Sequence, residues 1–417
     1  MKGMLHILHP PGVWRDRDLR WVAVGRAVST LGDEVALVAL LVHLFVAGAG
    51  TTGVAALLIA AALPTVLLSP WAGRLIDITD SRWLLFCTAV LQAIACGAVA
   101  GALVVDASLG VLVTAVIALQ SLQVVAGPAW QVLVPTIVGD AETGKALAAL
   151  QSVVLLAGAF GPALGGLVVG LWSSAVALAV DAASFLFLAM VALRIRTRRR
   201  PKPSDKDEMP RLLDGLRSIR ADRMLLPLFV GLMAFVIAGE MTNVVEVFLV
   251  QGVLDGSPVV FGLLGAVFAC GAVVGSVLGG RAVDDSQRAK WALRAAAVLA
   301  TGLFLGGLAP SLIAFGLLWA VSGVALGALN VVVMTLVIVR TQEARRGLVI
   351  ASINGISRAF SLLATLLGGA LGTLLGPRMT FAVAGAAALA VTTAMGILVT
   401  RAIQKAASAS DYQDRSL

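Results

Sequence analysis

Acidic residues stand inside apolar stretches of this chain, where a carboxylate is costly. The three that draw attention are Asp33, Glu240 and Glu246. A charged side chain at mid-membrane costs roughly 2.5 to 3.5 kcal/mol on insertion scales, and such residues usually face a cavity or a partner. An acid that is alternately exposed to water and buried can take up and release a proton. These residues are therefore our candidates for proton coupling, with a structural ion pair as the alternative.

Two arginines also lie within apolar runs and are the candidate charge partners. Arg26 precedes Asp33 by seven residues, which is about two helical turns and places both on one face. Arg358 follows Asn354 by one turn in a later run. For Asp181, which stands in another apolar run, we favour a structural ion pair.

Uncharged amides in the apolar runs form a second set of candidates, for contact with a substrate. They are Gln123, Gln151, Asn243, Asn330 and Asn354. Aromatic residues make up only 6% of the chain. A cavity with few aromatic and few hydrogen-bonding groups suits a hydrophobic or amphipathic molecule better than a sugar.

The composition shows which elements must position these residues. Of the 417 residues 59% are hydrophobic and 13% charged, far from the balance of a soluble globular protein. A helix needs about 20 apolar residues to span a bilayer. Twelve stretches qualify, near 21–46, 53–76, 83–105, 109–135, 146–170, 172–193, 225–250, 258–280, 291–309, 311–339, 348–375 and 378–400. The sequence predicts an all-α membrane protein with twelve transmembrane helices.

An internal repeat divides these helices into two halves. One offset of 207 positions places Gly32 and Asp33 onto Gly239 and Glu240, and Gly73, Arg74 and Asp77 onto Gly280, Arg281 and Asp284. The alternative is chance alignment in a sequence rich in Gly and Ala. Six helices per half is an even number, so both halves enter the membrane in the same orientation. We therefore expect two six-helix bundles related by a pseudo-twofold axis along the membrane normal.

Basic residues predict the orientation of the chain. With both termini in the cytoplasm, 28 of the 31 Lys and Arg residues fall on the cytoplasmic side. The net charge of +8 is thus a topology signal. Binding of a polyanion is the alternative, but we expect no nucleic-acid partner. We expect a protein of the bacterial inner membrane with an N-terminal arm (1–20), an N-terminal bundle (21–193), a linker (194–224), a C-terminal bundle (225–401) and a cytoplasmic tail (402–417).

The predicted linker is basic and contains an amphipathic segment. Pro210 offers a helix start ahead of Leu212, Leu213, Leu216 and Ile219, which share one helical face. A short helix of this kind can lie on the inner membrane surface and contact anionic lipids. A plain tether between the halves is the alternative.

Sites for cofactors or metals are not indicated by the sequence. The three cysteines and three histidines lack metal-ligand spacing, and no phosphate-binding loop or His-Glu-x-x-His motif is present. We expect no metal, no cofactor and no enzymatic activity, and we expect the protein to be a monomer.

A proton gradient can supply the energy for transport. One proton that crosses a potential of about 150 mV supplies about 3.5 kcal/mol, which can maintain a substrate gradient of about 300-fold.

Two glycine-containing motifs resemble those of the major facilitator superfamily. Gly73, Leu75, Asp77 and Arg82 resemble its loop signature between helices 2 and 3, and Gly161, Pro162, Gly165 and Gly166 are similar to the helix 5 motif of its antiporters. The resemblance implies a gating loop, for which Gly73, Asp77 and Arg82 are the candidates with Gly280 and Asp284 in the second half. It also implies a hinge in helix 5. Simple helix packing explains each glycine taken singly equally well.

More specific stretches are similar to the exporter branch that includes enterobactin and macrolide efflux proteins. They are residues 26–33, 128–135, 148–152 and 181–185. Two positions depart from the loop signature, since Ile78 replaces the usual basic residue and Asp80 stands where glycine is common. Helix 4 also lacks the arginine of many drug and proton antiporters.

These observations favour a secondary transporter that exports a hydrophobic or amphipathic small molecule, of the drug or siderophore class, in exchange for protons. Its partners would be the substrate, protons and membrane lipids. A lipid or lysophospholipid flippase and an uptake carrier are alternatives within transport. A membrane receptor or scaffold without transport is the alternative from another class.

Overall fold

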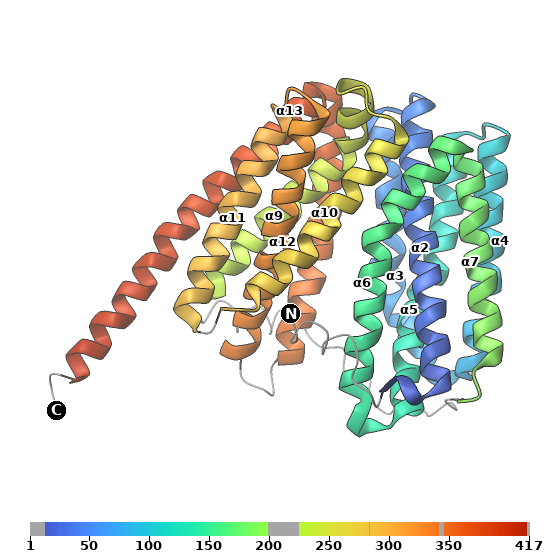
Figure 1. Cartoon of the computed structure of the whole chain (residues 1–417), viewed down its shortest axis with the longest axis horizontal. Helices are drawn as coiled ribbons and strands as arrows, with labels where there is room; N and C mark the ends of the chain where they lie inside the picture. The colour runs from blue at the N-terminus through green and yellow to red at the C-terminus, as the bar shows by residue number, and fades with distance from the viewer. Residues whose placement is uncertain (1–12, 199–224, 283, 342–345, 415–417) are drawn as a thin grey trace. The chain divides into compact units, whose positions relative to one another are not determined.

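The protein is described by a computed structural model that covers residues 13–198, 225–282, 284–341 and 346–414. These residues form helices joined by short turns, and no strand occurs among them. The elements are η1 (Val13–Arg15), α2 (Arg17–Val46), α3 (Gly50–Ile78), α4 (Ser81–Val104), α5 (Leu109–Val138), α6 (Asp140–Leu171), α7 (Ser174–Arg194), α9 (Leu225–Val247), η2 (Phe248–Val253), α10 (Pro258–Gly279), α11 (Asp285–Gly307), α12 (Leu312–Arg340) and α13 (Arg346–Asp414). Figure 1 shows their arrangement.

Eleven helical stretches of the described chain are long and apolar enough to cross a membrane. The last of them lies in α13, which bends at Gly376. Gly376 has φ 79° and ψ 169°, a conformation that glycine adopts without steric cost, and Pro377 then lacks a backbone N–H. Two helices therefore meet at this point, as the predicted ranges 348–375 and 378–400 require. The prediction of an all-helical fold with twelve helices is confirmed.

Most predicted helix ends agree with the structure to within a few residues. The largest difference is at the end of α13, which continues to Asp414, 14 residues past the predicted end at 400, so most of the predicted tail is helical. Two other differences come from polar first turns. α11 begins at Asp285, six residues before its predicted start, because the Asp284 carboxylate accepts a hydrogen bond from the Gln287 N–H at 2.7 Å and caps the helix. Helix α6 likewise begins before its predicted start at 146, because its polar first turn, from Asp140, is also helical. The π-helical turn η2, which continues α9, was not predicted.

The chain divides into two compact units. Unit 1 comprises Met1–Gly48, Ala60–Asp207 and Pro258–Leu263, and unit 2 comprises Ala49–Ile59, Glu208–Ser257 and Leu264–Leu417. The first turns of α3 thus belong to unit 2, and the first turns of α10 belong to unit 1. Two helices are therefore shared between the units.

In unit 1, α2 packs against α6 and α7, and α4 packs against α5 and α7. The core between these helices contains Leu19, Leu85, Trp130 and Leu188, all nearly or fully buried. Unit 2 has its own core, in which α9 packs against α13 and α11 against α12 and α13.

A buried carboxylate fixes the point where the chain leaves α7. Asp18 Oδ2 accepts hydrogen bonds from the Arg196 N–H at 2.9 Å and from the N–H and hydroxyl of Thr197, both at 2.8 Å. Nearby, the Arg194 guanidinium lies 5.4 Å from the centre of the Trp21 ring, within cation–π range. The predicted amphipathic helix and most of the predicted linker lie outside the described residues.

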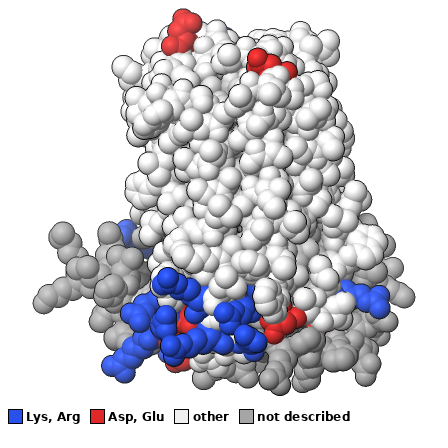
Figure 2. All heavy atoms as spheres, turned by 90° about the vertical axis from the view of Figure 1, so that its right-hand side faces the viewer, with Lys and Arg blue, Asp and Glu red and all other residues white. Residues whose placement is uncertain are grey.

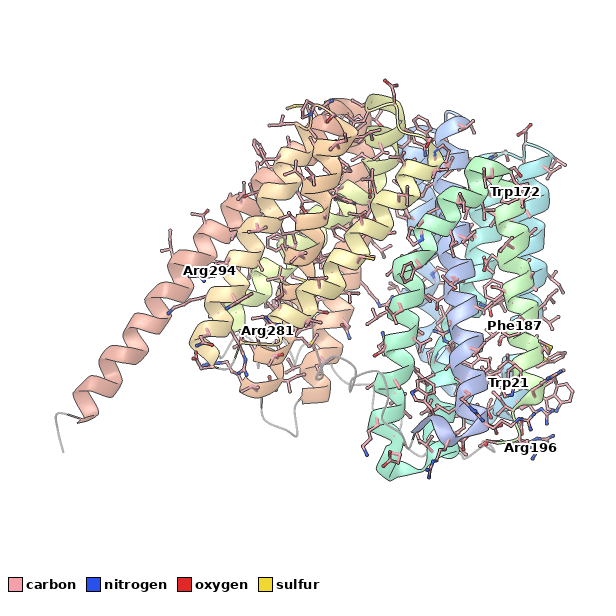
Figure 3. The ribbon with its side chains drawn as sticks, in the orientation of Figure 1. Trp21, Trp172, Phe187, Arg196, Arg281 and Arg294 are labelled. Carbon is pink, nitrogen blue, oxygen red and sulfur yellow. The ribbon has the colours of Figure 1, made fainter. Side chains whose placement is uncertain are left out.

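Charged and aromatic residues mark the two ends of unit 1. On the face drawn in Figure 2, Lys and Arg gather at one end together with some acidic residues, only acidic residues mark the other end, and uncharged residues fill the band between them. Figure 3 places Trp21 and Arg196 near one end of unit 1 and Trp172 near the other. Tryptophan is enriched at both interfaces of a membrane. The pattern is that of a multi-pass membrane protein.

Candidate functional site

Asp33 lies in a polar cluster inside unit 1. Its Oδ2 accepts a hydrogen bond from Gln123 Nε2 on α5 at 3.4 Å, and Gln123 Oε1 in turn accepts one from Gln92 Nε2 on α4 at 2.5 Å. Gln92 is completely buried, and its own carbonyl oxygen has no hydrogen-bond partner among the residues that the structure describes. The predicted cavity residue Gln123 therefore contacts the acid directly. Gln92 was missed because a buried amide has no sequence signal of its own.

Asp181 on α7 joins the same region. Its carboxylate accepts hydrogen bonds from Ser184 Oγ at 3.1 Å and from Cys96 Sγ at 3.3 Å. It lies close enough to Asp33 for the two charges to interact. Gly32 packs closely against Asp181 and Ser184. A Cβ added to Gly32 would lie only 2.9 Å from Ser184 Cβ. The cluster therefore holds two acids from different helices.

The predicted charge partners form no ion pair in the part of the chain that the structure describes. Arg26 influences Asp33 electrostatically, yet no nitrogen of Arg26 comes within 4 Å of a carboxylate oxygen. Arg358 is exposed, and no ion pair joins it to an acid among the described residues. Asp181 likewise has neutral partners, where we had favoured an ion pair.

Unit 2 contains a cavity of about 350 Å³, in the size range of small-molecule sites. Both acids of α9, Glu240 and Glu246, line it together with Asn243 and with Asn330 of α12. Leucine, valine and aromatic side chains make up most of the rest of the wall, Phe235, Phe268 and Trp319 among them. The structure thus brings four of the predicted site residues together in one cavity.

One acid of this cavity has a hydrogen-bond donor. Ser361 Oγ on α13 donates to Glu240 Oε1 at 2.8 Å. Glu246 shares the cavity wall with Trp319. Trp319 is held by aromatic contacts, with ring centres 4.9 Å from Phe268 and 5.1 Å from Phe315. Asn354, predicted for the substrate cavity, is exposed and does not line this one.

A second cavity, of about 320 Å³, lies in unit 1 between α2, α5 and α6. The predicted residues Arg26 and Gln151 line it, along with Gln131 and Trp130. Trp130 was missed because, within a sequence, an indole in an apolar run resembles any other core residue.

The two loops of the repeat differ in how they start the next helix. In the first loop Asp80 caps α4 by accepting from the N–H groups of Arg82 and Trp83, at 3.0 and 3.3 Å. In the second loop Asp284, which the repeat aligns with Asp77, is itself the cap of α11. The Arg82 side chain donates to the Leu193 carbonyl at the end of α7. Gly73 and Gly280 have no side chain close to the place of a Cβ, although backbone carbonyls lie 3.6 Å from that of Gly280.

The predicted hinge glycines lie at close helix contacts. A Cβ on Gly161 would meet the Glu34 side chain, and one on Gly165 would stand 3.0 Å from Val35 Cα, so both let α6 approach α2. Gly166 packs against Gly262 in the first turns of α10, within unit 1. Pro162 stands between them, inside the helix.

The described residues contain no group of three or more His, Cys, Asp or Glu side chains that could hold a metal ion. Their arrangement offers acids in hydrogen-bonded surroundings instead. Such groups can exchange protons or hold a cationic or hydrogen-bonding ligand.

The sequence profile described as "Major Facilitator Superfamily" matches residues 22–257 and 240–413. The chain belongs to this family. The match covers nearly the whole described chain and confirms the resemblance of the chain to the superfamily. Members of the superfamily are membrane transporters rather than enzymes.

Solved transporter structures share the fold of this superfamily member. A mutant of the nucleoside transporter NupG aligns with a TM-score of 0.75 at 11% identity, covering 92% of this chain and all of that one. A bacterial homologue of the iron transporter ferroportin, in an inward-facing state, gives 0.70 at 18% identity, with coverages of 92% and 98%. A bacterial homologue of the human lysosomal transporter Spinster gives 0.70 at 14%, with coverages of 92% and 96%. No curated protein matches by sequence.

Proposed function

We propose that this superfamily member is a secondary transporter that exports a hydrophobic or amphipathic small molecule in exchange for protons. The observation that carries the proposal is the unit 2 cavity, which combines two carboxylates with apolar and aromatic walls. An amphipathic molecule can bury its apolar part there while a polar group meets Glu240 or Glu246. The similarity of residues 26–33 and 181–185 to the enterobactin and macrolide exporters favours a drug or a siderophore as substrate.

Exchange follows if a proton and the substrate compete for the same carboxylate. A protonated acid has no charge and loses its attraction for a cationic or hydrogen-bond-donating group, so proton uptake on one side promotes substrate release there. Asp33 would serve as a second site of proton uptake, in the cluster with Gln123 and Asp181.

Alternating access requires helices that can slide, and small residues at helix contacts support this. Gly369 and Gly372 of α13 pack against the first turn of α3, where Thr51 Oγ1 donates to the Gly369 carbonyl at 2.9 Å. Contacts of this kind contain few interlocking side chains.

The location of the protein is part of the proposal. We place it in the bacterial inner membrane with both termini in the cytoplasm. The clustering of Lys and Arg at one end of unit 1 supports this orientation.

Everted membrane vesicles that contain the protein test the proposal. Respiration acidifies their interior, and adding enterobactin or erythromycin should then dissipate the pH gradient. We expect Asp33→Asn and Glu240→Gln each to abolish this response. Asp106→Asn is the matched control, because Asp106 is an exposed turn residue with φ 47°, a conformation that asparagine also tolerates.

An unchanged response in Glu240→Gln would remove this acid from the mechanism. Uptake of labelled substrate into the vesicles without a change in the pH gradient would contradict proton exchange. The absence of any flux, with these and other amphipathic compounds, would favour a receptor or scaffold.

A further inference from the structure

Hydrogen-bond donors line the cavity of unit 1, and no carboxylate is among its described lining residues. Arg26 comes from α2, Trp130 and Gln131 from α5, and Gln151 from α6. The guanidinium and the indole are donors only, whereas the two amides can donate or accept. The remaining wall is apolar and includes Val22 and Leu150. This is the reverse of the acidic unit 2 cavity.

Arg26 is the feature of this cavity that most favours an anionic ligand. It lines the cavity, and its side chain forms no hydrogen bond or ion pair within the described ranges. The Trp130 side chain is 2% exposed, and its N–H is buried without an acceptor among the described residues, so the indole forms part of the wall and its N–H does not face the cavity. A ligand with acceptor oxygens would pair with the guanidinium.

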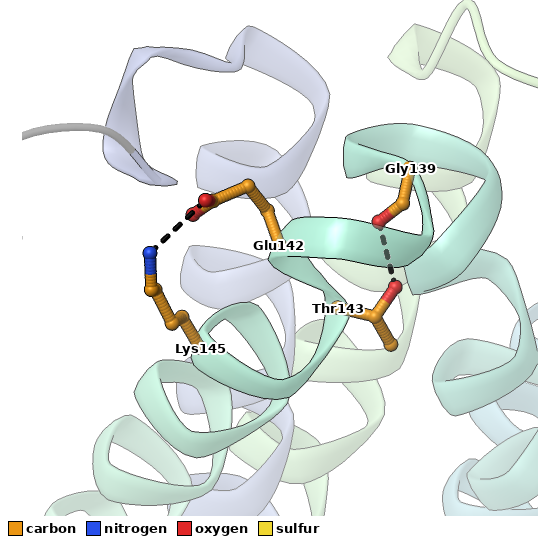
Figure 4. A network of polar contacts seen from close by, with 4 residues as sticks. All are labelled: Gly139, Glu142, Thr143 and Lys145. Atoms are coloured by element: carbon orange, nitrogen blue, oxygen red, sulfur yellow. Dashed lines mark hydrogen bonds and ion pairs between the residues drawn. The ribbon is translucent and has the colours of Figure 1, made fainter.

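The helices hold these donors in fixed positions. A sharp turn joins α5 to α6 at Gly139, whose φ of 77° favours glycine. Figure 4 shows how the turn is closed, by a hydrogen bond of 2.8 Å from Thr143 Oγ1 to the Gly139 carbonyl and an ion pair of 3.0 Å between Lys145 and Glu142. Glu142 is therefore paired with a lysine of its own helix.

The position of the cavity along the helices suits a molecule that enters from the basic end. Arg26 is nine residues from the start of α2, and Gln131 is seven from the end of α5. At 1.5 Å per residue both lie about 10 to 14 Å from these helix ends. The ends are the predicted cytoplasmic ones.

We propose that the unit 1 cavity binds the carboxylate or phosphate group of an amphiphilic anion, with Arg26 as its main donor and the amides of Gln131 and Gln151 beside it. The apolar wall then receives the hydrocarbon next to that group. A guanidinium suits this role because it can form two parallel hydrogen bonds to a carboxylate or phosphate. The inference rests on the proposed function and deepens it by adding a site for an anionic head group, separate from the acids of unit 2, within the same transporter.

Binding of matched amphiphiles to the purified protein tests the inference. Decyl phosphate, decanoate and decyltrimethylammonium share a ten-carbon chain and differ in the head group. With the full chain in phosphatidylcholine nanodiscs, calorimetry should show saturable binding of both anions, which Arg26→Gln should weaken. Any binding of the cation would occur at the acids of unit 2 and should be the same in the parent and in Arg26→Gln. Binding of the anions no stronger in the parent than in Arg26→Gln would overturn the proposal.

A substitution then assigns the main donor. Arg26→Gln should weaken the binding of decyl phosphate by about tenfold or more, the effect of losing a charged hydrogen bond. Arg294→Gln, in an exposed position on α11, is the matched control and should bind as the parent does. Unchanged affinity in a folded Arg26→Gln protein would contradict the assignment.

A competition experiment shows whether the bound anion is a membrane lipid or a water-soluble amphiphile. If the ligand is a membrane phospholipid, phosphatidylglycerol in the nanodisc should compete with decyl phosphate in the parent protein but not in Arg26→Gln. If it is a water-soluble amphiphile, phosphatidylglycerol should leave the affinity unchanged. Anion binding requires no proton gradient, so a failure of proton exchange in vesicles would not contradict this site. If the protein transports a substrate but binds no anion, only the anion site is contradicted.

Discussion

Asp33 and Glu240 occupy equivalent positions of the sequence repeat but lie in different surroundings. Asp33 stands in a closed cluster with Gln123 and a second acid, whereas Glu240 lines an open cavity and accepts from Ser361. The cavity of unit 1 is lined by donors, and that of unit 2 by acids and amides. At these aligned positions, the two halves thus differ in their chemistry. We infer that the two halves contribute different groups to one transport cycle.

The glycines that precede the two acids should show the largest difference. An alanine at Gly32 would press its Cβ against Asp181 and Ser184, while the corresponding place at Gly239 is open. We expect Gly32→Ala to destabilise the protein by about 1 to 3 kcal/mol through overpacking. Gly239→Ala should be neutral or stabilising, because alanine is the better helix former.

Thermal unfolding in detergent, followed by size-exclusion chromatography, measures both variants side by side. Equal losses of stability at the two positions would contradict the contrast between a closed cluster and an open cavity.

Removing the hydrogen-bond donor of each acid should also affect the two halves differently, but by less. Ser361→Ala removes a hydrogen bond of 2.8 Å to Glu240, and Gln123→Leu removes one of 3.4 Å to Asp33. Because hydrogen bonds to charged groups contribute about 1.5 to 3 kcal/mol and weaken with length, we expect Ser361→Ala to reduce substrate exchange about tenfold, and Gln123→Leu to reduce it less. Initial rates in everted vesicles, normalised to protein amount, give the comparison; a greater loss in Gln123→Leu would reverse the ranking.

The helix caps that follow the two loops should give the smallest difference. Asp80→Ala removes two hydrogen bonds from the start of α4, and Asp284→Ala removes one from the start of α11. Loss of a cap costs about 1 kcal/mol, so we expect Asp80→Ala to lower the unfolding temperature slightly more. Replacement by Asn, which also caps, should restore stability in both loops. No recovery with Asn would indicate that these carboxylates act through their charge and not as caps.

Much of the fold could be predicted because apolar length is local information. The twelve runs predicted the helices, and even the break at Gly376 and Pro377 was foreseen as the gap between two runs. The early start of α11 could have been found from Asp284 and Gln287, whose spacing of three is typical of a capping pair.

The site could be predicted only in part, because contacts between distant helices leave no trace in a single sequence. Glu240, Glu246 and Asn243 share a face of one helix, and their common cavity follows from spacing. The donor to Glu240 lies 121 residues away in the chain, and nothing near either residue announces the contact. The sequence likewise gives no sign that Asp181 lies beside Gly32, or that the indole of Trp130 is buried.

The carboxylate of Asp18 has a practical consequence for work on the separate halves. It accepts hydrogen bonds from Arg196 and Thr197 and so holds their backbone against the first turn of α2. These two residues are therefore structurally part of the first half, although they follow its last helix. A gene divided to express the halves as two polypeptides should therefore be cut after Thr197. A cut before Arg196 would leave Asp18 as a buried anion without its three donors and would give a misleading picture of how well the first half folds alone.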